Sequence, residues 1–109
     1  MSFLEIFKSV DINKELNRCR TTKGAILLDV RTEEEYRQGH IGGSRNIPVE
    51  KIGNAVNLLH DKSAPIFVYC LSGQRSRKAV SALRKLGYTE VYNIGGIEQY
   101  QGQLQRGKR

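Results

Sequence analysis

The chain has 109 residues and a net charge of +7, from 18 Lys and Arg against 11 Asp and Glu. This length suits one domain with one hydrophobic core, and 39% hydrophobic with 27% charged residues is typical of a globular protein. No apolar run approaches the roughly 18 residues of a membrane span, and the first residues lack the basic and apolar regions of a secretory signal. Two cysteines are too few for a disulfide framework. We therefore expect a cytoplasmic protein that does not bind membranes.

The basic excess is not accompanied by a sequence signature of a nucleic-acid-binding fold, so we expect no nucleic-acid partner. A basic field of this kind concentrates small anions near a site. Part of the charge lies in the segment 105–109, which is predicted to be a solvated tail. We predict a single domain over 1–109, with its core over about residues 5–104.

Short apolar runs alternate with amphipathic segments along the chain. We expect strands over 26–30, 44–47 (weak), 66–69 and 91–93. Before and between them we expect a helix from Ile12 capped by Asp11, a short helix capped by Thr32 with Glu35 and ending at Gly39, and a helix after Pro48. A further helix reaches Leu86 with Gly87 as its cap, and a final helix follows Gly95-Gly96. The segment 1–10 is ambiguous, although its apolar residues Phe3, Leu4, Ile6 and Phe7 must pack somewhere.

Apolar residues recur at helical spacing in the predicted helices. The sets are Ile12, Leu16 and Cys19; Ile52, Val56 and Leu59; Ala79, Val80, Leu83 and Leu86; and Ile97, Tyr100 and Leu104. Cys19 is therefore interpreted as a core residue. Strands that alternate with helices favour an α/β domain with a largely parallel sheet, in which ligands bind at the carboxyl ends of the strands.

Cys70 lies at the carboxyl end of the strongest predicted strand, in a short loop before a helix. Backbone N–H groups at a helix N-terminus lack intrahelical partners and favour negative charge, so this position lowers the pKa of a thiol and stabilises the nucleophilic thiolate. Gly73 permits the tight curl that makes successive N–H groups an anion-binding nest. Ser76 can cap the helix or donate its hydroxyl to the anion. We expect chemistry at this loop.

Several short motifs around this loop occur in a characteristic order. They are Leu28-Asp29-Val30-Arg31, Glu35-Tyr36, Gly39-His40-Ile41, Asn46-Ile47-Pro48, the loop from Cys70 to Arg75-Ser76, and Gly95-Gly96. Together they resemble a single-domain rhodanese of the thiosulfate sulfurtransferase family over nearly the whole chain. The resemblance implies a small central, mostly parallel sheet with helices on both faces.

The same resemblance implies a sulfurtransferase that moves a sulfane sulfur through a persulfide on Cys70, without a metal or organic cofactor. The implied donor is thiosulfate. Leu71 and Ser72 depart from the family pattern because neither is basic, which favours a persulfide or polysulfide as the alternative donor. The implied acceptors are cyanide, a thiol or a protein that accepts sulfur. The implied substrate-binding loop comprises Leu71, Ser72, Gly73, Gln74, Arg75 and Ser76, with Asp29 and Arg31 in support.

The individual residues also have structural interpretations, which stay open at this point. Arg75 either orients substrate or pairs with a carboxylate. Asp29 anchors loops, whereas Arg31 lines the pocket mouth or has only a structural role. His40 resembles a structural turn histidine, and His60 is expected at the surface. Because the two histidines are isolated and no cysteine cluster accompanies them, we expect no zinc site.

Two alternative functions remain. One is a sulfur-carrier or regulatory rhodanese module that acts only with a partner protein. The other is a rhodanese-fold phosphatase or arsenate reductase, which the loop length disfavours. Cys70 and Arg75 are separated by four residues, whereas cysteine phosphatases place five residues between the cysteine and the arginine.

Overall fold

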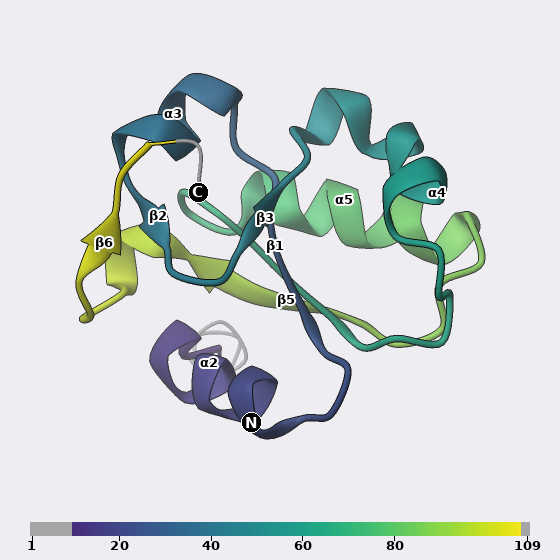
Figure 1. Ribbon diagram of the computed structural model, residues 1–109, viewed down its shortest axis with the longest axis horizontal. Coiled ribbons are helices and arrows are strands. Elements are labelled where there is room, and N and C mark those ends of the chain that lie inside the picture. Colours follow the sequence, from purple (N-terminus) through teal and green to yellow (C-terminus); the bar gives the residue numbers. More distant parts are fainter. Residues whose placement is uncertain (1–9, 108–109) are drawn as a thin grey trace, which may run out of the picture.

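The computed structural model describes residues 10–107, and its centre is a parallel sheet (Figure 1). The strands are β1 (Ile26–Asp29), β3 (Arg45–Asn46), β4 (Ile66–Cys70) and β5 (Val91–Gly96), in the spatial order β3-β1-β4-β5. All three pairings are parallel, so the carboxyl ends of the strands lie at one edge of the sheet. A second, antiparallel pair joins β2 (His40–Ile41) to β6 (Leu104–Gln105).

Helices cover both faces of this sheet, as predicted. The helices are α2 (Ile12–Thr21), α3 (Glu33–Gln38), the 3-10 helix η1 (Val49–Asn54), α4 (Ala55–Leu58), α5 (Gln74–Lys85) and the 3-10 helix η2 (Ile97–Gln99). One apolar cluster joins α4 and α5 to the sheet and includes Val68 and Cys70. The other joins α2 to the opposite face and includes Cys19 and Phe67. β4 is buried along its whole length because it contributes to both clusters.

The local signals at the helix ends behave as their chemistry dictates. The Asp11 carboxylate accepts the backbone N–H of Asn13 at the start of α2. The hydroxyl of Thr32 and the carboxylate of Glu35 form the reciprocal capping box of α3.

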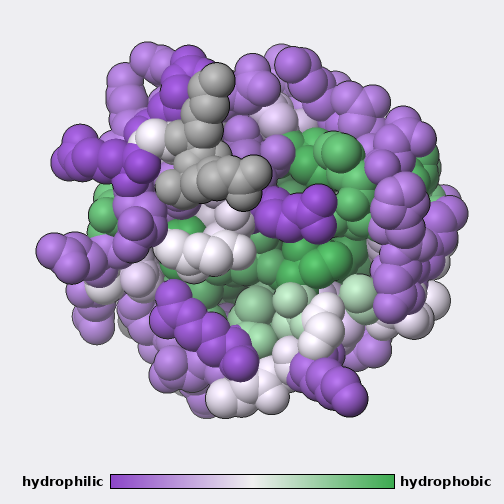
Figure 2. Space-filling view, viewed as in Figure 1, coloured by the Kyte–Doolittle hydropathy of each residue, from purple (hydrophilic) through white to green (hydrophobic). Residues whose placement is uncertain are grey.

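The surface seen in Figure 2 is hydrophilic around its rim, and its hydrophobic side chains lie mainly in the middle and right of the view. Within residues 10–107, no helix has the length and apolar character needed to cross a membrane.

The predicted final helix is wrong. β5 continues through Gly95-Gly96, only η2 follows, and the chain is extended again at Tyr100. Leu104 pairs with Ile41 in the β2–β6 ladder instead of joining a helical face, and its side chain is 44% exposed. Strand pairing thus overrides an apolar spacing that was compatible with a helix.

The segment after Pro48 is also less regular than predicted. η1 has a kink at Lys51 before the single turn of α4, so the periodicity expected of one α-helix breaks down. Val56 is exposed and its neighbour Ala55 is fully buried. The weak strand expected over 44–47 is reduced to β3.

The ends of the chain differ from the predicted boundaries. Gln105 belongs to β6, and the backbone N–H of Gly107 donates to the carbonyl of Arg37, although both positions fall in the predicted tail. The apolar residues Phe3, Leu4, Ile6 and Phe7 lie outside the described residues.

A buried ion pair fixes the backbone directly after β1. Asp29 is 0% exposed and its carboxylate accepts both Nε and Nη2 of Arg31, at 3.1 Å and 2.7 Å. Arg31 also donates to the carbonyl of Gly39 at 2.6 Å, which ties β1 to the end of α3. Removing one partner of a buried pair leaves an uncompensated charge, which is more destabilising than losing an exposed pair.

We therefore expect Asp29→Asn to lower the free energy of unfolding by about 3–5 kcal/mol, measured by urea denaturation, because the Arg31 guanidinium stays buried without its counter-charge. The matched control is Glu34→Gln, which breaks the exposed pair with Arg37 and is expected to change stability by less than about 1 kcal/mol. Equal effects of the two substitutions would contradict a structural role for the Asp29–Arg31 pair.

Candidate functional site

The loop between β4 and α5 curls around the Cys70 sulfur. Cys70 is the last residue of β4, and the N-cap of α5 is Gly73, whose φ of +103° is in the left-handed region. This conformation favours glycine and aims the N–H of Gly73 at Sγ, at 3.0 Å. The Ser76 hydroxyl lies 3.4 Å from the same sulfur. The cysteine is only 1% exposed, so the sulfur sits at the base of the loop.

These contacts decide the acidity of the thiol. Burial by itself raises the pKa of Cys70, but the Ser76 hydroxyl and the loop N–H groups outweigh it and hold the pKa below the usual thiol value. The contributing N–H groups are those of Ser76, Gly73 and Ser72. The site therefore stabilises a negative charge on sulfur within a water-poor environment.

The second of two consecutive glycines in β5, Gly96, makes room for this loop. A Cβ on Gly96 would overlap the carbonyl oxygen of Leu71, so any other residue there displaces the loop. The same carbonyl accepts the N–H of Glu98 at 3.3 Å, which ties the loop to the start of η2. Gly95 and Gly96 precede the predicted final helix in the sequence, but both belong to β5, and Gly96 permits this close approach to the loop.

Asn93 in β5 supports the loop from the other side, although no sequence motif marks it as a site residue. Its Nδ2 donates to the carbonyl of Gly73 at 3.1 Å, and its Oδ1 accepts the Ser76 hydroxyl at 2.7 Å. The N–H of Gly95 donates to the same Oδ1 at 2.9 Å. Asn93 thereby positions Ser76, the side chain that contacts the sulfur.

Arg75 pairs with a carboxylate, which was one of its two open interpretations. Its Nη1 and Nη2 donate to the two carboxylate oxygens of Glu35 at 2.7 Å and 2.9 Å. The Arg75 hydrogen bonds, together with capping at Thr32, lower the pKa of Glu35 to about 2 despite its partial burial. The bidentate pair links α3 to the first turn of α5. The sequence predicts Glu35 as a helix cap and includes it in the Glu35-Tyr36 motif, whereas its contact with the loop arises from the tertiary structure.

The other predicted site residues divide between the loop and the interior. Leu71 and Ser72 are exposed on the loop, and Gln74 is exposed as the first residue of α5. Ser76 lies in the first turn of α5 and not at its N-cap. Asp29 and Arg31 are bonded to each other and are buried, so Arg31 does not line the mouth of the site.

The second cysteine and the histidines occupy structural positions. Cys19 is buried with α2 on the face of the sheet opposite Cys70, and desolvation raises its pKa. His40 is buried, stacks on the Tyr36 ring at 3.7 Å, and contacts the carbonyl of Tyr36 through Nδ1, in agreement with a structural histidine. His60 is exposed as predicted. No cluster of metal-ligating side chains occurs in the part of the chain that the structure describes.

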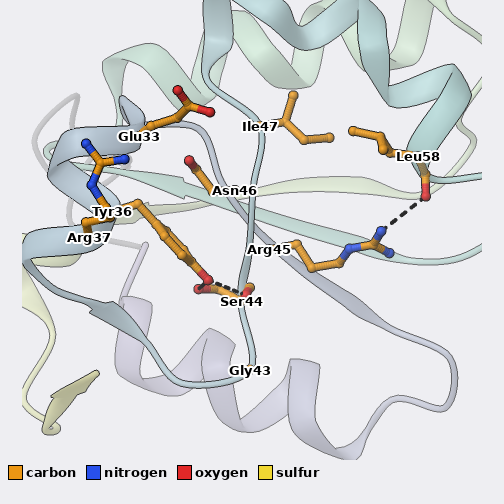
Figure 3. A pocket seen from close by; sticks show the side chains of 9 residues that line it. All are labelled: Glu33, Tyr36, Arg37, Gly43, Ser44, Arg45, Asn46, Ile47 and Leu58. Carbon is orange, nitrogen blue, oxygen red and sulfur yellow. Dashed lines mark hydrogen bonds between the residues drawn. The ribbon is translucent and has the colours of Figure 1, made fainter. Parts of the chain in front are cut away.

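A groove of about 950 Å³ lies among α3, β3 and α4 (Figure 3), and Cys70 is not one of its lining residues. Tyr36 and Ser44 meet in it through a hydrogen bond of 2.6 Å, and Arg45 donates to the carbonyl of Leu58. Its lining residues are Glu33, Tyr36, Arg37, Gly43, Ser44, Arg45, Asn46, Ile47 and Leu58. None of these is a nucleophile of the kind found at Cys70, so the groove is not the candidate reaction site.

Comparisons with known proteins identify the family to which this arrangement belongs. Residues 11–103 match the family model described as Rhodanese-like domain. Thiosulfate sulfurtransferase PspE of Escherichia coli is 38% identical over 72 residues, which cover 65% of this chain and 69% of PspE. The putative sulfur carrier protein YrkF of Bacillus subtilis is 34% identical over 104 residues, and this match covers 94% of the chain and about half (51%) of YrkF.

Solved structures show the same fold. The structure described as rhodanese with anions from E. coli superimposes with a TM-score of 0.70 at 33% identity, covering 76% of this chain and 99% of that one. The predicted α/β architecture, with a parallel sheet between two helical layers, is thus confirmed as the rhodanese fold. Its sulfurtransferase relatives place the protein in a family of sulfur-transferring domains. The chain belongs to the Rhodanese-like domain family.

Proposed function

We propose that this protein is a sulfurtransferase that carries a sulfane sulfur on Cys70 from thiosulfate, a persulfide or a polysulfide to cyanide or a thiol. The observation that supports this most is the acidified thiol at the centre of a loop of N–H donors. A thiolate is the nucleophile required to accept sulfur, and the resulting persulfide is an anion that the same donors stabilise. The sulfurtransferase relatives support the same reaction class.

In the first step the Cys70 thiolate attacks the outer sulfur of thiosulfate. A sulfur–sulfur bond forms to Cys70, the bond to the sulfonate sulfur breaks, and sulfite leaves with the bonding electron pair. In the second step an acceptor nucleophile attacks the outer sulfur of the persulfide, and the electron pair of the broken bond returns to Cys70 as thiolate. Covalent catalysis therefore splits the transfer into two displacements. Both displacements balance with the Cys70 side chain and the two substrates as the reactants.

The sulfur-carrier alternative is favoured by one observation. YrkF, whose name describes a putative sulfur carrier, matches nearly the whole of this chain. A carrier loads the same cysteine but transfers sulfur only to a partner protein.

Phosphatase-like hydrolysis has less support, because four residues and not five separate Cys70 from Arg75, and the Arg75 guanidinium is bonded to Glu35. We place the activity in a reducing cytoplasm, since both cysteines are free thiols.

Intact-mass measurement after incubation with thiosulfate tests the nucleophile. We expect wild-type protein to gain about 32 Da, the mass of one sulfur atom, and to lose it on addition of cyanide. Cys70→Ser should show no gain, whereas the control Cys19→Ser should behave as wild type because Cys19 packs against the opposite face of the sheet. A gain that survives in Cys70→Ser would contradict the proposed nucleophile. If folded wild-type protein gains mass from a polysulfide but not from thiosulfate, the donor is a persulfide or polysulfide.

The acidity of the thiol is tested by the pH dependence of alkylation with iodoacetamide. Hydrogen bonds to the thiolate lower the pKa of Cys70, so the rate should reach half its maximum below the pH expected of a free thiol. Ser76→Ala removes the hydroxyl that contacts Sγ and lowers the pKa of Cys70, so the midpoint should move to higher pH. Asn17→Ala, an exposed change on α2, is the control and should leave the midpoint in place. An unmoved midpoint in Ser76→Ala would show that the loop N–H groups suffice.

The role of Arg75 is tested by comparing Arg75→Met, Glu35→Gln and the double variant. If the pair only braces the loop, either single change should reduce kcat/KM for thiosulfate by a similar factor, about tenfold or less, and the double variant should add little, because each change breaks the same contact. If Arg75 binds the donor anion directly, Arg75→Met will raise KM for thiosulfate well beyond Glu35→Gln. The second pattern would restore the substrate-orienting interpretation.

A further inference from the structure

The outer side of α5 is strongly basic and is not used by the proposed chemistry. All charged residues of this helix are basic. Within residues 10–107, Arg75 alone among them forms an ion pair. Of the others, Arg77, Arg84 and Lys85 are exposed and line one groove. Unpaired cations gathered in a concave surface attract an anionic partner.

The groove is a concave surface in which one of the basic side chains is fixed by a hydrogen bond. It has a volume of about 480 Å³ and is completed by Val80, Ser81 and Asn93. The Arg84 guanidinium is held in place by donating to the carbonyl of Val91 at 2.7 Å. Arg77 and Arg84 are seven residues apart, so they present positive charge at two points about 10 Å apart along the helix. No acidic residue lines the groove.

Its position connects the groove to the thiol. Asn93 lines the groove and also bonds to Ser76 and Gly73 of the loop around Sγ. Cys70 and the groove residue Val80 belong to the same apolar cluster, so the groove and the sulfur lie on the same side of the sheet. A molecule seated along α5 therefore lies next to the loop from which sulfur leaves.

We propose that the α5 groove docks the acidic surface of a protein that accepts sulfur through its own cysteine. This inference rests on the proposed function and names the class of its acceptor. The acceptor's thiolate attacks the outer sulfur of the Cys70 persulfide. A new sulfur–sulfur bond forms on the acceptor, and Cys70 leaves as thiolate with the electron pair, so no oxidant or reductant is consumed.

A protein fits the groove better than RNA does. Single-stranded RNA is recognised largely by stacking of bases on aromatic side chains, and none of the groove residues is aromatic. Carboxylate groups need only the guanidinium and ammonium donors that the groove supplies. A protein acceptor also brings the thiol that the second displacement requires.

The test measures sulfur transfer from persulfide-loaded protein to a synthetic cysteine peptide with glutamates on both sides of the cysteine. Ser81→Glu with Lys85→Glu lowers the summed charge of the groove residues from +3 to zero without touching the loop. The control is Asn17→Glu with Arg20→Glu on α2, which makes the same change in net charge on the opposite face. We expect the groove variant to transfer about tenfold more slowly at low salt, the control to match wild type, and the difference to shrink at high salt. A peptide with glutamines in place of the glutamates should not distinguish the proteins.

Three results overturn the proposal: equal rates for the groove variant and wild type, an equal loss in the α2 control, or a groove-dependent complex with a single-stranded oligoribonucleotide that is tighter than the complex with the acidic peptide. Transfer to 2-mercaptoethanol, a small neutral thiol, separates this proposal from the proposed function. Wild type, the groove variant and the α2 control should transfer sulfur to this thiol at the same rate. Loss of that transfer in wild type would mean that the sulfurtransferase assignment itself fails.

Discussion

The close approach of two backbones is the constraint on which the site depends. The loop after β4 can aim its N–H groups at one sulfur only while β5 lies directly beneath it, and β5 can lie there only without a side chain at Gly96. The parallel register of β4 and β5, which places Cys70 opposite Gly96, sets this geometry. The acidity of the thiol is thus a property of strand pairing as much as of the loop sequence.

Two polar contacts then hold the loop from either side. Asn93 binds the loop carbonyl at Gly73 and the hydroxyl of Ser76, and Glu35 holds the guanidinium of Arg75. Neither residue touches the sulfur. Both act by restricting the backbone and side chains that do, which is how a small α/β domain can keep several donors pointed at one atom.

Much of this arrangement could be predicted from the sequence, because it rests on local chemistry. The Asp11 cap, the Thr32–Glu35 capping box and the position of Cys70 at the end of an apolar strand follow from neighbouring residues. The rest depends on contacts between distant segments. Leu104 in β6 pairs with Ile41 in β2, which lies 63 residues earlier in the sequence. No local pattern distinguishes this pairing from a helix. Asn93 and Gly96 matter only because the sheet brings them under the loop.

The separation of the two cysteines has a consequence for the lifetime of the sulfur-loaded state. Cys70 and Cys19 lie in apolar clusters on opposite faces of the sheet, and desolvation raises the pKa of Cys19. A nearby second thiolate would attack the inner sulfur of a persulfide, form an internal disulfide and expel hydrosulfide. The sheet stands between the two cysteines, so this discharge route is closed within one molecule. In the proposed function, a persulfide on Cys70 is therefore protected from discharge by the chain's own Cys19, and its sulfur leaves only to a second molecule.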